Sequence, residues 1–345
     1  MTRQIRVGEV FVGGGAPVSI QSMLNTKTTD VAGSLAQIEA LRAAGCEIAR
    51  LAVPDRDAAA GFAEIAAHSP LPLVADIHFD WRLAILAAEG GAKKVRINPG
   101  NIGDAGKVRE VADCCRERGI PIRVGVNAGS LEKSLLEKYG HPTPEALVES
   151  ALGHTRLLEE VGFTDICVSI KASSVPLTIA AYRLMAAQTD YPLHLGVTET
   201  GTERMGVIKS AIGIGSLLCD GIGDTIRVSL TADPVREVVA ARDILQAAGI
   251  RQTGVRFISC PTCGRTSIDL IGLAGRVEAA LADCRKPITV AVMGCVVNGP
   301  GEAREADVGI AGGKGEGVLF CHGEIVKKVP ESELLTALLA LVETL

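Results

Sequence analysis

Three cysteines in the last third of the chain have the spacing of a metal or cluster site. Cys260 and Cys263 belong to a Cys-Pro-Thr-Cys turn, and Cys295 follows later in the segment MGCVVNGPGEA. A C-x-x-C turn can direct two thiolates to one metal, and a third cysteine on a glycine-flanked turn would complete a three-thiolate face. The fourth ligand is open, because Glu302 follows the Gly-Pro-Gly turn while no fourth cysteine stands at a matching spacing.

The single C-x-x-C pair disfavours a zinc ribbon with four cysteine ligands. An iron-sulfur cluster with one exchangeable ligand fits three cysteines better, since an exchangeable iron can bind substrate. A zinc site and a redox-active disulfide remain as alternatives.

A second set of candidate residues closes short apolar runs in the first two thirds of the chain. These polar residues are Gln21, Arg50, Asp76, His78, Arg96, Asn98, Arg123, Asn127, Lys171, Glu199, Arg227 and Ser229. Several cations within apolar strands would be unfavourable without an anionic partner. The planar fork of arginine suits bidentate phosphate contacts, so converging arginines and Lys171 indicate a diphosphate. The alternative is that the cations point outward and pair with helix carboxylates.

Two carboxylates in this set could transfer protons. Asp76 and Glu199 end runs on opposite halves of the predicted structure, and either could act on a bound substrate. Either could instead be only the ion-pair partner of a neighbouring arginine. Lys171 has a second possible role as the Schiff-base lysine of an aldolase, because nearby arginines would favour its unprotonated form.

Eight apolar, β-branched runs alternate with segments of helical spacing and would position these residues. The runs cover residues 18–23, 48–53, 72–77, 94–99, 121–126, 165–170, 193–198 and 225–230. Eight βα units in succession predict a (β/α)8 TIM barrel over residues 1–250, with its active site at the carboxyl ends of the strands. An open, doubly wound sheet is the runner-up, although no G-x-G-x-x-G follows the first run.

Residues 251–345 predict a small α+β module that carries the three cysteines. Its expected strands cover residues 255–258, 288–293, 308–311 and 317–321, and its expected helices cover residues 268–284 and 331–345.

The composition is that of a soluble globular protein with a mildly acidic charge. The chain has 35 Lys and Arg residues against 40 Asp and Glu residues, for a formal net charge of −5. This balance argues against a nucleic-acid or anionic-membrane surface, while a local cluster of arginines remains compatible with it. The first residues lack the apolar stretch of a secretory signal, and no run approaches the roughly 18 residues of a membrane helix. We therefore expect a cytoplasmic protein with reduced thiols.

Taken together, the motifs resemble the 4-hydroxy-3-methylbut-2-enyl diphosphate synthase family over the whole chain. They are LAVPD (51–55), ADIHF (75–79), VRINPGNIG (95–103), IRVGVNAGSLE (122–132), SIKAS (169–173), LGVTETG (195–201), FISCPTCGRT (257–266) and MGCVVNGPGEA (293–303).

The resemblance implies a TIM barrel followed by a sulfite-reductase-like domain with one 4Fe-4S cluster per subunit. The cluster ligands map onto Cys260, Cys263, Cys295 and Glu302, and Glu302 is also implied in catalysis. The implied reaction is the two-electron reductive ring opening of 2-C-methyl-D-erythritol 2,4-cyclodiphosphate, with flavodoxin or ferredoxin as donor. The implied assembly is a homodimer whose active site forms in trans.

The resemblance also assigns roles on the barrel. The substrate-binding positions correspond to Arg50, Arg96, Arg123, Asn127, Lys171 and Ser229, and Glu199 corresponds to the family's proposed acid/base. Three competing interpretations each explain part of the chain: an aldolase with structural zinc, a pterin-binding methyl-transfer barrel, and a non-catalytic iron-sulfur carrier.

Overall fold

The computed structural model describes residues 1–252, 254–282, 284–295 and 305–345. The chain divides into two compact units, Met1–Arg251 and Gln252–Leu345.

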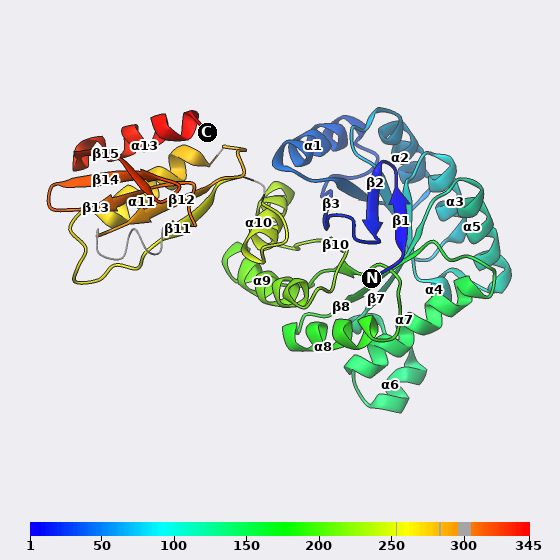
Figure 1. The fold of residues 1–345 in the computed structure, drawn as a ribbon. Coiled ribbons are helices and arrows are strands. Elements are labelled where there is room, and N and C mark those ends of the chain that lie inside the picture. The colour runs from blue at the N-terminus through cyan, green and yellow to red at the C-terminus, as the bar shows by residue number, and fades with distance from the viewer. Residues whose placement is uncertain (253, 283, 296–304) are drawn as a thin grey trace. The chain divides into compact units, whose positions relative to one another are not determined.

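The first unit is an eight-stranded parallel barrel, as the sequence predicts (Figure 1). Its strands are β3 (Ser19–Met23), β4 (Ile48–Ala52), β5 (Leu73–Asp76), β6 (Lys94–Ile97), β7 (Ile122–Asn127), β8 (Ile166–Lys171), β9 (His194–Leu195) and β10 (Thr225–Ile226). A bridge between Val168 and Leu193 closes the ring between β8 and β9. The last two strands are shorter than predicted, because regular pairing ends after two residues.

Eight helices surround the strands (Figure 1). They are α1 (Val31–Ala44), α2 (Arg56–His68), α3 (Trp81–Glu89), α5 (Ala105–Glu117), α7 (Pro144–Glu159), α8 (Val175–Ala186), α9 (Glu203–Cys219) and α10 (Pro234–Ala247). Most of them begin after an Asp, Ser or Thr whose side chain accepts a backbone N–H of the first turn, such as Asp30 or Thr143. This capping, rather than helix propensity alone, fixes where these helices start.

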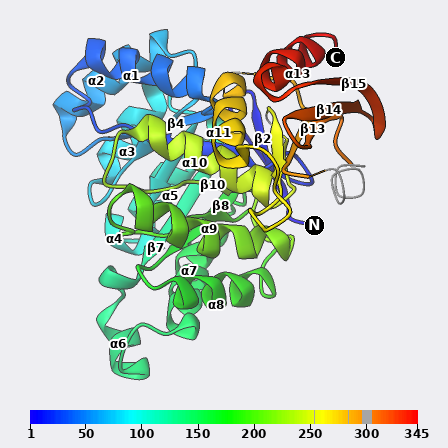
Figure 2. The ribbon, with the colours of Figure 1, turned by 90° about the vertical axis from the view of Figure 1, so that its left-hand side faces the viewer.

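Short helices follow two strands at the carboxyl end of the barrel. Helix α4 (Pro99–Ile102) follows β6, and η1 (Ala128–Ser130) and α6 (Lys133–Tyr139) follow β7. Figure 2 shows α6 outside the ring, beyond α7. These insertions follow the strands that carry Arg96, Arg123 and Asn127 of the predicted site.

An N-terminal hairpin, which the sequence analysis did not predict, covers the amino end of the barrel. It consists of β1 (Gln4–Val7) and β2 (Val10–Gly13), paired antiparallel. Its buried side chains Ile5, Val7 and Val12 pack against Ile48, Val74 and Cys167 inside the ring. The hairpin therefore closes that end with apolar side chains.

The second unit is built on a five-stranded mixed sheet with the order β11-β12-β13-β14-β15. The strands are β11 (Arg256–Ser259), β12 (Thr289–Met293), β13 (Val308–Gly312), β14 (Glu316–Cys321) and β15 (Glu324–Pro330). Its helices are α11 (Leu270–Leu281), η2 (Glu331–Glu333) and α13 (Leu334–Glu343). Strand β15 was not predicted from the sequence, and the predicted helix over residues 268–284 is longer than α11 at both ends. The helix begins after Asp269, whose carboxylate caps the N–H of Gly272.

Candidate active site

Successive side chains along each barrel strand point alternately outward, toward the surrounding helices, and inward, toward the inside of the barrel. Leu51, Val95 and Val124 belong to the apolar cluster between strands and helices. The residues before or after them, Arg50, Arg96 and Arg123, must therefore face the inside of the barrel. All three are buried. The outward orientation considered for the arginines is thus wrong.

Asp76 is the carboxylate around which two arginines are arranged. Its Oδ1 lies 3.4 Å from Arg96 Nη1, and its Oδ2 lies 3.9 Å from Arg50 Nε. Burial would raise the pKa of Asp76, but the nearby guanidinium groups outweigh it and hold the pKa at about 2. Asp76 is therefore an anion at neutral pH, and it orients the two arginines.

Arg123 is fully buried and only partly paired. Its Nη1 donates to Ser169 Oγ at 2.8 Å, while Nε and Nη2 have no partner among the described residues. Burial and the neighbouring Arg96 lower the pKa of Arg123 to about 10, so it remains a cation at neutral pH. Unpaired donors on a buried cation require an anion or ordered water.

Gly125 gives Arg96 the room it occupies. Arg96 Nη2 donates to Gly125 O at 2.8 Å, and a Cβ on this glycine would lie 2.5 Å from Arg96 Nε. The Gly125 N–H donates to Asn98 Oδ1 at 3.0 Å, which ties the segment after β6 to β7.

Three predicted residues line one cavity at the carboxyl ends of β7, β8 and β9. Asn127, Lys171 and Glu199 share this cavity of about 360 Å³. Burial and the charges of Arg50 and Arg227 lower the pKa of Lys171 well below its usual value. An anion in contact with Lys171 would offset this effect and favour its charged form.

The Glu199 backbone has φ 53°, in the left-handed region that a residue with a side chain rarely adopts. The next residue, Thr200, donates its hydroxyl to Ser229 O, which joins the segments that follow β9 and β10. Backbone strain held in place by such a contact is typical of functional sites. The fold therefore brings the segment that carries Glu199 next to the segment that carries Ser229.

Arg227 and Glu237 extend the site beyond the predicted binding residues. Arg227 Nη2 lies 3.6 Å from Glu237 Oε2, and the N–H of Leu230 donates to Glu237 Oε1 at 2.8 Å. Burial raises the pKa of Glu237. The sequence placed Arg227 among the polar residues that close the apolar runs but not among the substrate-binding residues, and it lies two residues before Ser229, since alternate strand residues share a face. Glu237 lies on a helix, and no sequence signal marks it.

The second unit brings the cysteines to one end of its sheet. Strands β11 and β12 are parallel neighbours, and Cys260 and Cys295 follow their carboxyl ends. The N–H of Gly294 lies 3.2 Å from Cys260 Sγ. Hydrogen bonds from the backbone and side chain of Arg265 lower the pKa of Cys263.

None of the ten cysteines is paired in a disulfide. Among the described residues, no three His, Cys, Asp or Glu side chains lie close enough to hold a metal ion. Glu302, the predicted fourth ligand, falls in the segment 296–304, outside the described residues.

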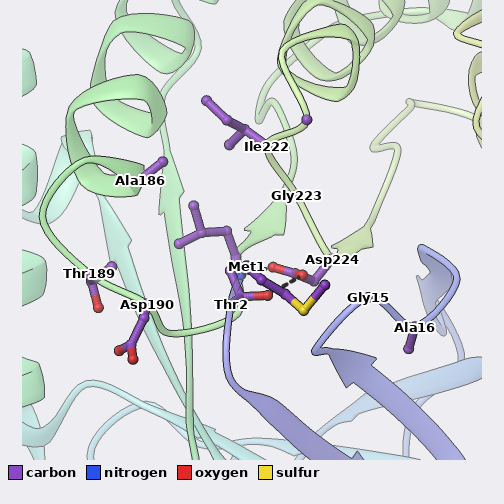
Figure 3. A pocket seen from close by; sticks show the side chains of 12 residues that line it. Met1, Thr2, Gly15, Ala16, Ala186, Thr189, Asp190, Ile222, Gly223 and Asp224 are labelled. Carbon is purple, nitrogen blue, oxygen red and sulfur yellow. Dashed lines mark hydrogen bonds between the residues drawn. The ribbon is translucent and has the colours of Figure 1, made fainter.

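Another cavity, of about 500 Å³, lies at the opposite end of the barrel (Figure 3). Two of the residues that line it are the carboxylates Asp190 and Asp224. Asp190 pairs with Arg3, and Asp224 accepts from the Thr2 hydroxyl and the Leu193 N–H. Because both carboxylates already have partners, we assign no chemistry to this cavity.

None of the helices in the described part of the chain combines the length and apolar character needed to cross a bilayer.

The fold and site define a class: a (β/α)8-barrel protein with arginines buried inside the barrel, followed by a second domain that carries cysteines at the carboxyl ends of two parallel strands. A family model described as "GcpE TIM-barrel domain" matches residues 2–242, and "GcpE protein C-terminal domain" matches residues 256–344. The chain belongs to the GcpE family.

Curated relatives agree over the full length. A Geobacter sulfurreducens protein named 4-hydroxy-3-methylbut-2-en-1-yl diphosphate synthase (flavodoxin) is 63% identical over 342 residues, covering 99% of this chain and 97% of the relative. A Clostridium perfringens protein of the same name is 59% identical, covering 100% of this chain and 99% of the relative. The family predicted from the motifs is confirmed.

Solved structures show the barrel fold alone. Dihydropteroate synthase from Yersinia pestis superposes with a TM-score of 0.50 at 15% identity, covering 73% of this chain and 100% of that one. The Coxiella burnetii enzyme gives 0.51 at 12% identity, covering 71% and 97%. At this identity the likeness carries no information about pterin binding.

Proposed function

We propose that this chain is an oxidoreductase that converts 2-C-methyl-D-erythritol 2,4-cyclodiphosphate to (E)-4-hydroxy-3-methylbut-2-enyl diphosphate. Two electrons and two protons open the ring and release one water. The names of its full-length relatives support this assignment. The observation that carries it is the group of arginines buried inside the barrel, Arg50, Arg96 and Arg123, of which Arg123 keeps Nε and Nη2 without a partner among the described residues.

The cations would bind the diphosphate. Arg50, Arg96, Arg123 and Lys171 converge from β4, β6, β7 and β8, and we add Arg227 from the segment after β10. Asn127 and Ser229 would supply neutral contacts at the rim. Fixed guanidinium groups stabilise the charge that accumulates on a diphosphate as the ring C–O bond breaks.

Two carboxylates would have different tasks. Glu199, at the rim cavity beside Lys171, is the group we propose to transfer a proton. Asp76 stays ionised between Arg50 and Arg96, so it would hold those arginines in place. A direct catalytic role for Asp76, expected from the sequence, stays a prediction.

The donor set of the second unit fits an iron-sulfur cluster. Thiolates are the usual ligands of such clusters, and Cys260 and Cys295 stand at the ends of neighbouring parallel strands. Cys263 lies on the same turn as Cys260. These cysteines, with Glu302, would hold one 4Fe-4S cluster per subunit. When bound, the cluster supplies single-electron reduction.

Flavodoxin or ferredoxin is the proposed electron donor, because the names of the relatives include flavodoxin. A homodimer with an active site formed in trans and a cytoplasmic location stay predictions.

Anaerobic turnover tests the assignment. The purified protein receives the cyclodiphosphate and a strong one-electron reductant, and metal content is measured on the same sample. Iron together with the linear diphosphate supports the proposal. Zinc without product contradicts it.

Arg123→Ala should raise KM about 100-fold, because a buried charge contact is worth about 2–3 kcal/mol. Arg109→Ala, an exposed arginine on α5, is the matched control.

A class I aldolase is the second candidate, because the depressed pKa of Lys171 suits a Schiff-base nucleophile. Borohydride trapping of a carbonyl substrate on Lys171 would favour it. Trapping that fails while the cyclodiphosphate is consumed would eliminate it.

A further inference from the structure

A deeper layer of polar side chains lies in the barrel, below the arginines of the proposed diphosphate site. Lys94 stands two residues before Arg96 on β6, so it faces the interior one layer closer to the amino end. His194 begins β9 and Ser19 begins β3 in the same way. Lys94 and His194 have no exposed surface, and Ser19 is 1% exposed. The proposed reaction uses none of them.

Ser19, His194 and a further buried residue, Thr225 on β10, lie side by side on neighbouring strands. Thr225 is in register with Ser19 on one side and with His194 on the other. Its Oγ1 lies 3.4 Å from His194 Nδ1. Burial and the charges of Arg123 and Lys94 lower the pKa of His194 well below its usual value, so the ring is neutral. The neutral ring carries a single proton, and its Nε2 has no hydrogen-bond partner among the described residues.

The layer presents donors without protein acceptors. Lys94 Nζ, His194 Nε2, Ser19 Oγ and the Nε and Nη2 atoms of Arg123 have no hydrogen-bond partner among the described residues. Of these groups, the Lys94 ammonium and the Arg123 guanidinium can only donate. Buried donors are rarely left unpaired, so this lining calls for an acceptor.

The nearby carboxylates are already engaged. Asp76 faces Arg50 and Arg96, and Glu237 accepts from Leu230 and faces Arg227. The pKa of Lys94, lowered to about 8 by burial and by Arg123 and Arg50, still leaves mostly ammonium at pH 7. Cys167, the thiol that acts on Lys94, has a pKa raised by burial, so it adds no negative charge. The layer is therefore positive and uncompensated.

The surroundings favour an ion that loses its water readily. Val7 and Val12 of the hairpin pack below the layer against Ile48, Val74 and Cys167. Charge interactions are strong in such a dry environment, whereas removing the hydration shell of a multivalent anion is costly. A monovalent ion of low charge density, such as chloride or bromide, suits these conditions better than a phosphate.

We infer that Lys94 and Arg123, near the neutral ring of His194, bind one small monovalent inorganic anion of the halide class, below and separate from the proposed diphosphate site. Arg123 is shared by the two sites. The inner anion would pair the donors of Arg123 that Ser169 leaves free, and so fix its guanidinium for the ligand above.

Two measurements on the anaerobically purified holoprotein test this inference. Crystals soaked in bromide should show an anomalous peak in contact with Lys94 Nζ. The melting temperature should be about 2–4 °C higher in chloride or bromide than in gluconate at equal ionic strength, because a ligand that binds only the folded state stabilises it.

The variant Lys94→Met should lose both effects, and Lys93→Met should keep both. Lys93 is the exposed residue that directly precedes Lys94 in the chain. Equal melting temperatures in the three salts with no inner peak would overturn the inference and leave ordered water in the layer. A peak at the mouth alone would overturn it too. If Lys94→Met does not fold, the wild-type anomalous map decides. Neither measurement needs turnover, so failure of the proposed reaction would be seen separately.

Discussion

The Arg227 guanidinium lies 3.6 Å from the carboxylate of Glu237, a residue of α10 and not of a barrel strand. Glu237 is 4% exposed, and it also accepts the Leu230 N–H at 2.8 Å. One helix side chain therefore fixes both an arginine of the proposed site and the turn that follows Ser229.

The variant Glu237→Gln should raise KM about tenfold, equivalent to about 1.4 kcal/mol, with a smaller change in kcat. Gln keeps the shape and an acceptor for Leu230, but it loses the charge that orients Arg227. Steady-state kinetics on the cyclodiphosphate measures this effect. Glu203→Gln, in an exposed pair with Arg236, is the control.

A double-mutant cycle separates this role from general destabilisation. If Glu237 acts through Arg227, Arg227→Met combined with Glu237→Gln should have the KM of Arg227→Met alone. Multiplicative losses in KM would show that the two residues act independently.

Gly125→Ala should weaken diphosphate binding about tenfold and destabilise the barrel by about 1–3 kcal/mol, since overpacking forces neighbours to move. The added Cβ would meet Arg96 Nε at 2.5 Å. Denaturant unfolding and KM give the two numbers.

Gly153→Ala on α7 is the matched control, because a Cβ there meets no atom within 4 Å. It should stabilise the barrel by about 0.5–1 kcal/mol through helix propensity. A Gly125→Ala protein with wild-type KM would refute the close fit at Arg96.

Cys295→Ser should reduce cluster affinity at least about tenfold, since metal affinity falls 10–100-fold even when supporting groups are changed. Iron per protein and visible absorbance measure the loss. Cys219→Ser, an exposed thiol at the end of α9, should retain full iron.

Glu302→Ala should keep diphosphate binding while impairing cluster stability or turnover. Unchanged iron content together with an unchanged rate would exclude Glu302 as a ligand.

His154 predicts a pH effect on stability. Its Nδ1 accepts from the Gly100 N–H at 3.0 Å, and its Nε2 lies 2.9 Å from Glu132 Oε1. Because Nδ1 must be unprotonated to accept, the folded protein favours the neutral ring. Burial lowers the His154 pKa below its usual 6.5. The unfolded chain therefore takes up a proton first, and this contribution to stability is complete above pH 6.5 and is lost as pH falls below it.

The melting temperature should thus drop on acidification from pH 7.5 to 5.5, and less steeply in His154→Gln, which keeps an acceptor for Gly100. The exposed His68→Gln is the control. Parallel melting curves for His154→Gln and the wild type would contradict the assignment.

The barrel could be predicted from the sequence because its strands alternate with capped helices and end in polar residues. Local pattern carries that information. The hairpin β1–β2 was missed because its strands are four residues long and flank a Gly-Glu turn, a weak signal beside eight longer runs. Strand β15 was missed because its exposed Glu-Ile-Val-Lys-Lys residues lack the alternation of a half-buried strand.

The site was predictable where the alternation of side chains along a strand decides which of them face the inside of the barrel. Arg50, Arg96 and Arg123 share the interior face with Asp76, and period two gives this directly. Glu237 was not predictable, because its contact with Arg227 depends on how α10 packs against the ring. The positive φ of Glu199 is likewise set by tertiary contacts, including the one from Thr200 to Ser229.

The β1–β2 hairpin has a kinetic consequence. Because Val7 and Val12 fill the amino end of the ring, molecules exchange with the proposed site only through the carboxyl-end opening. A newly formed diphosphate must then depart along the route by which the next cyclodiphosphate arrives. Occupancy by one excludes the other, so turnover at high product concentration is set by competition for a single passage.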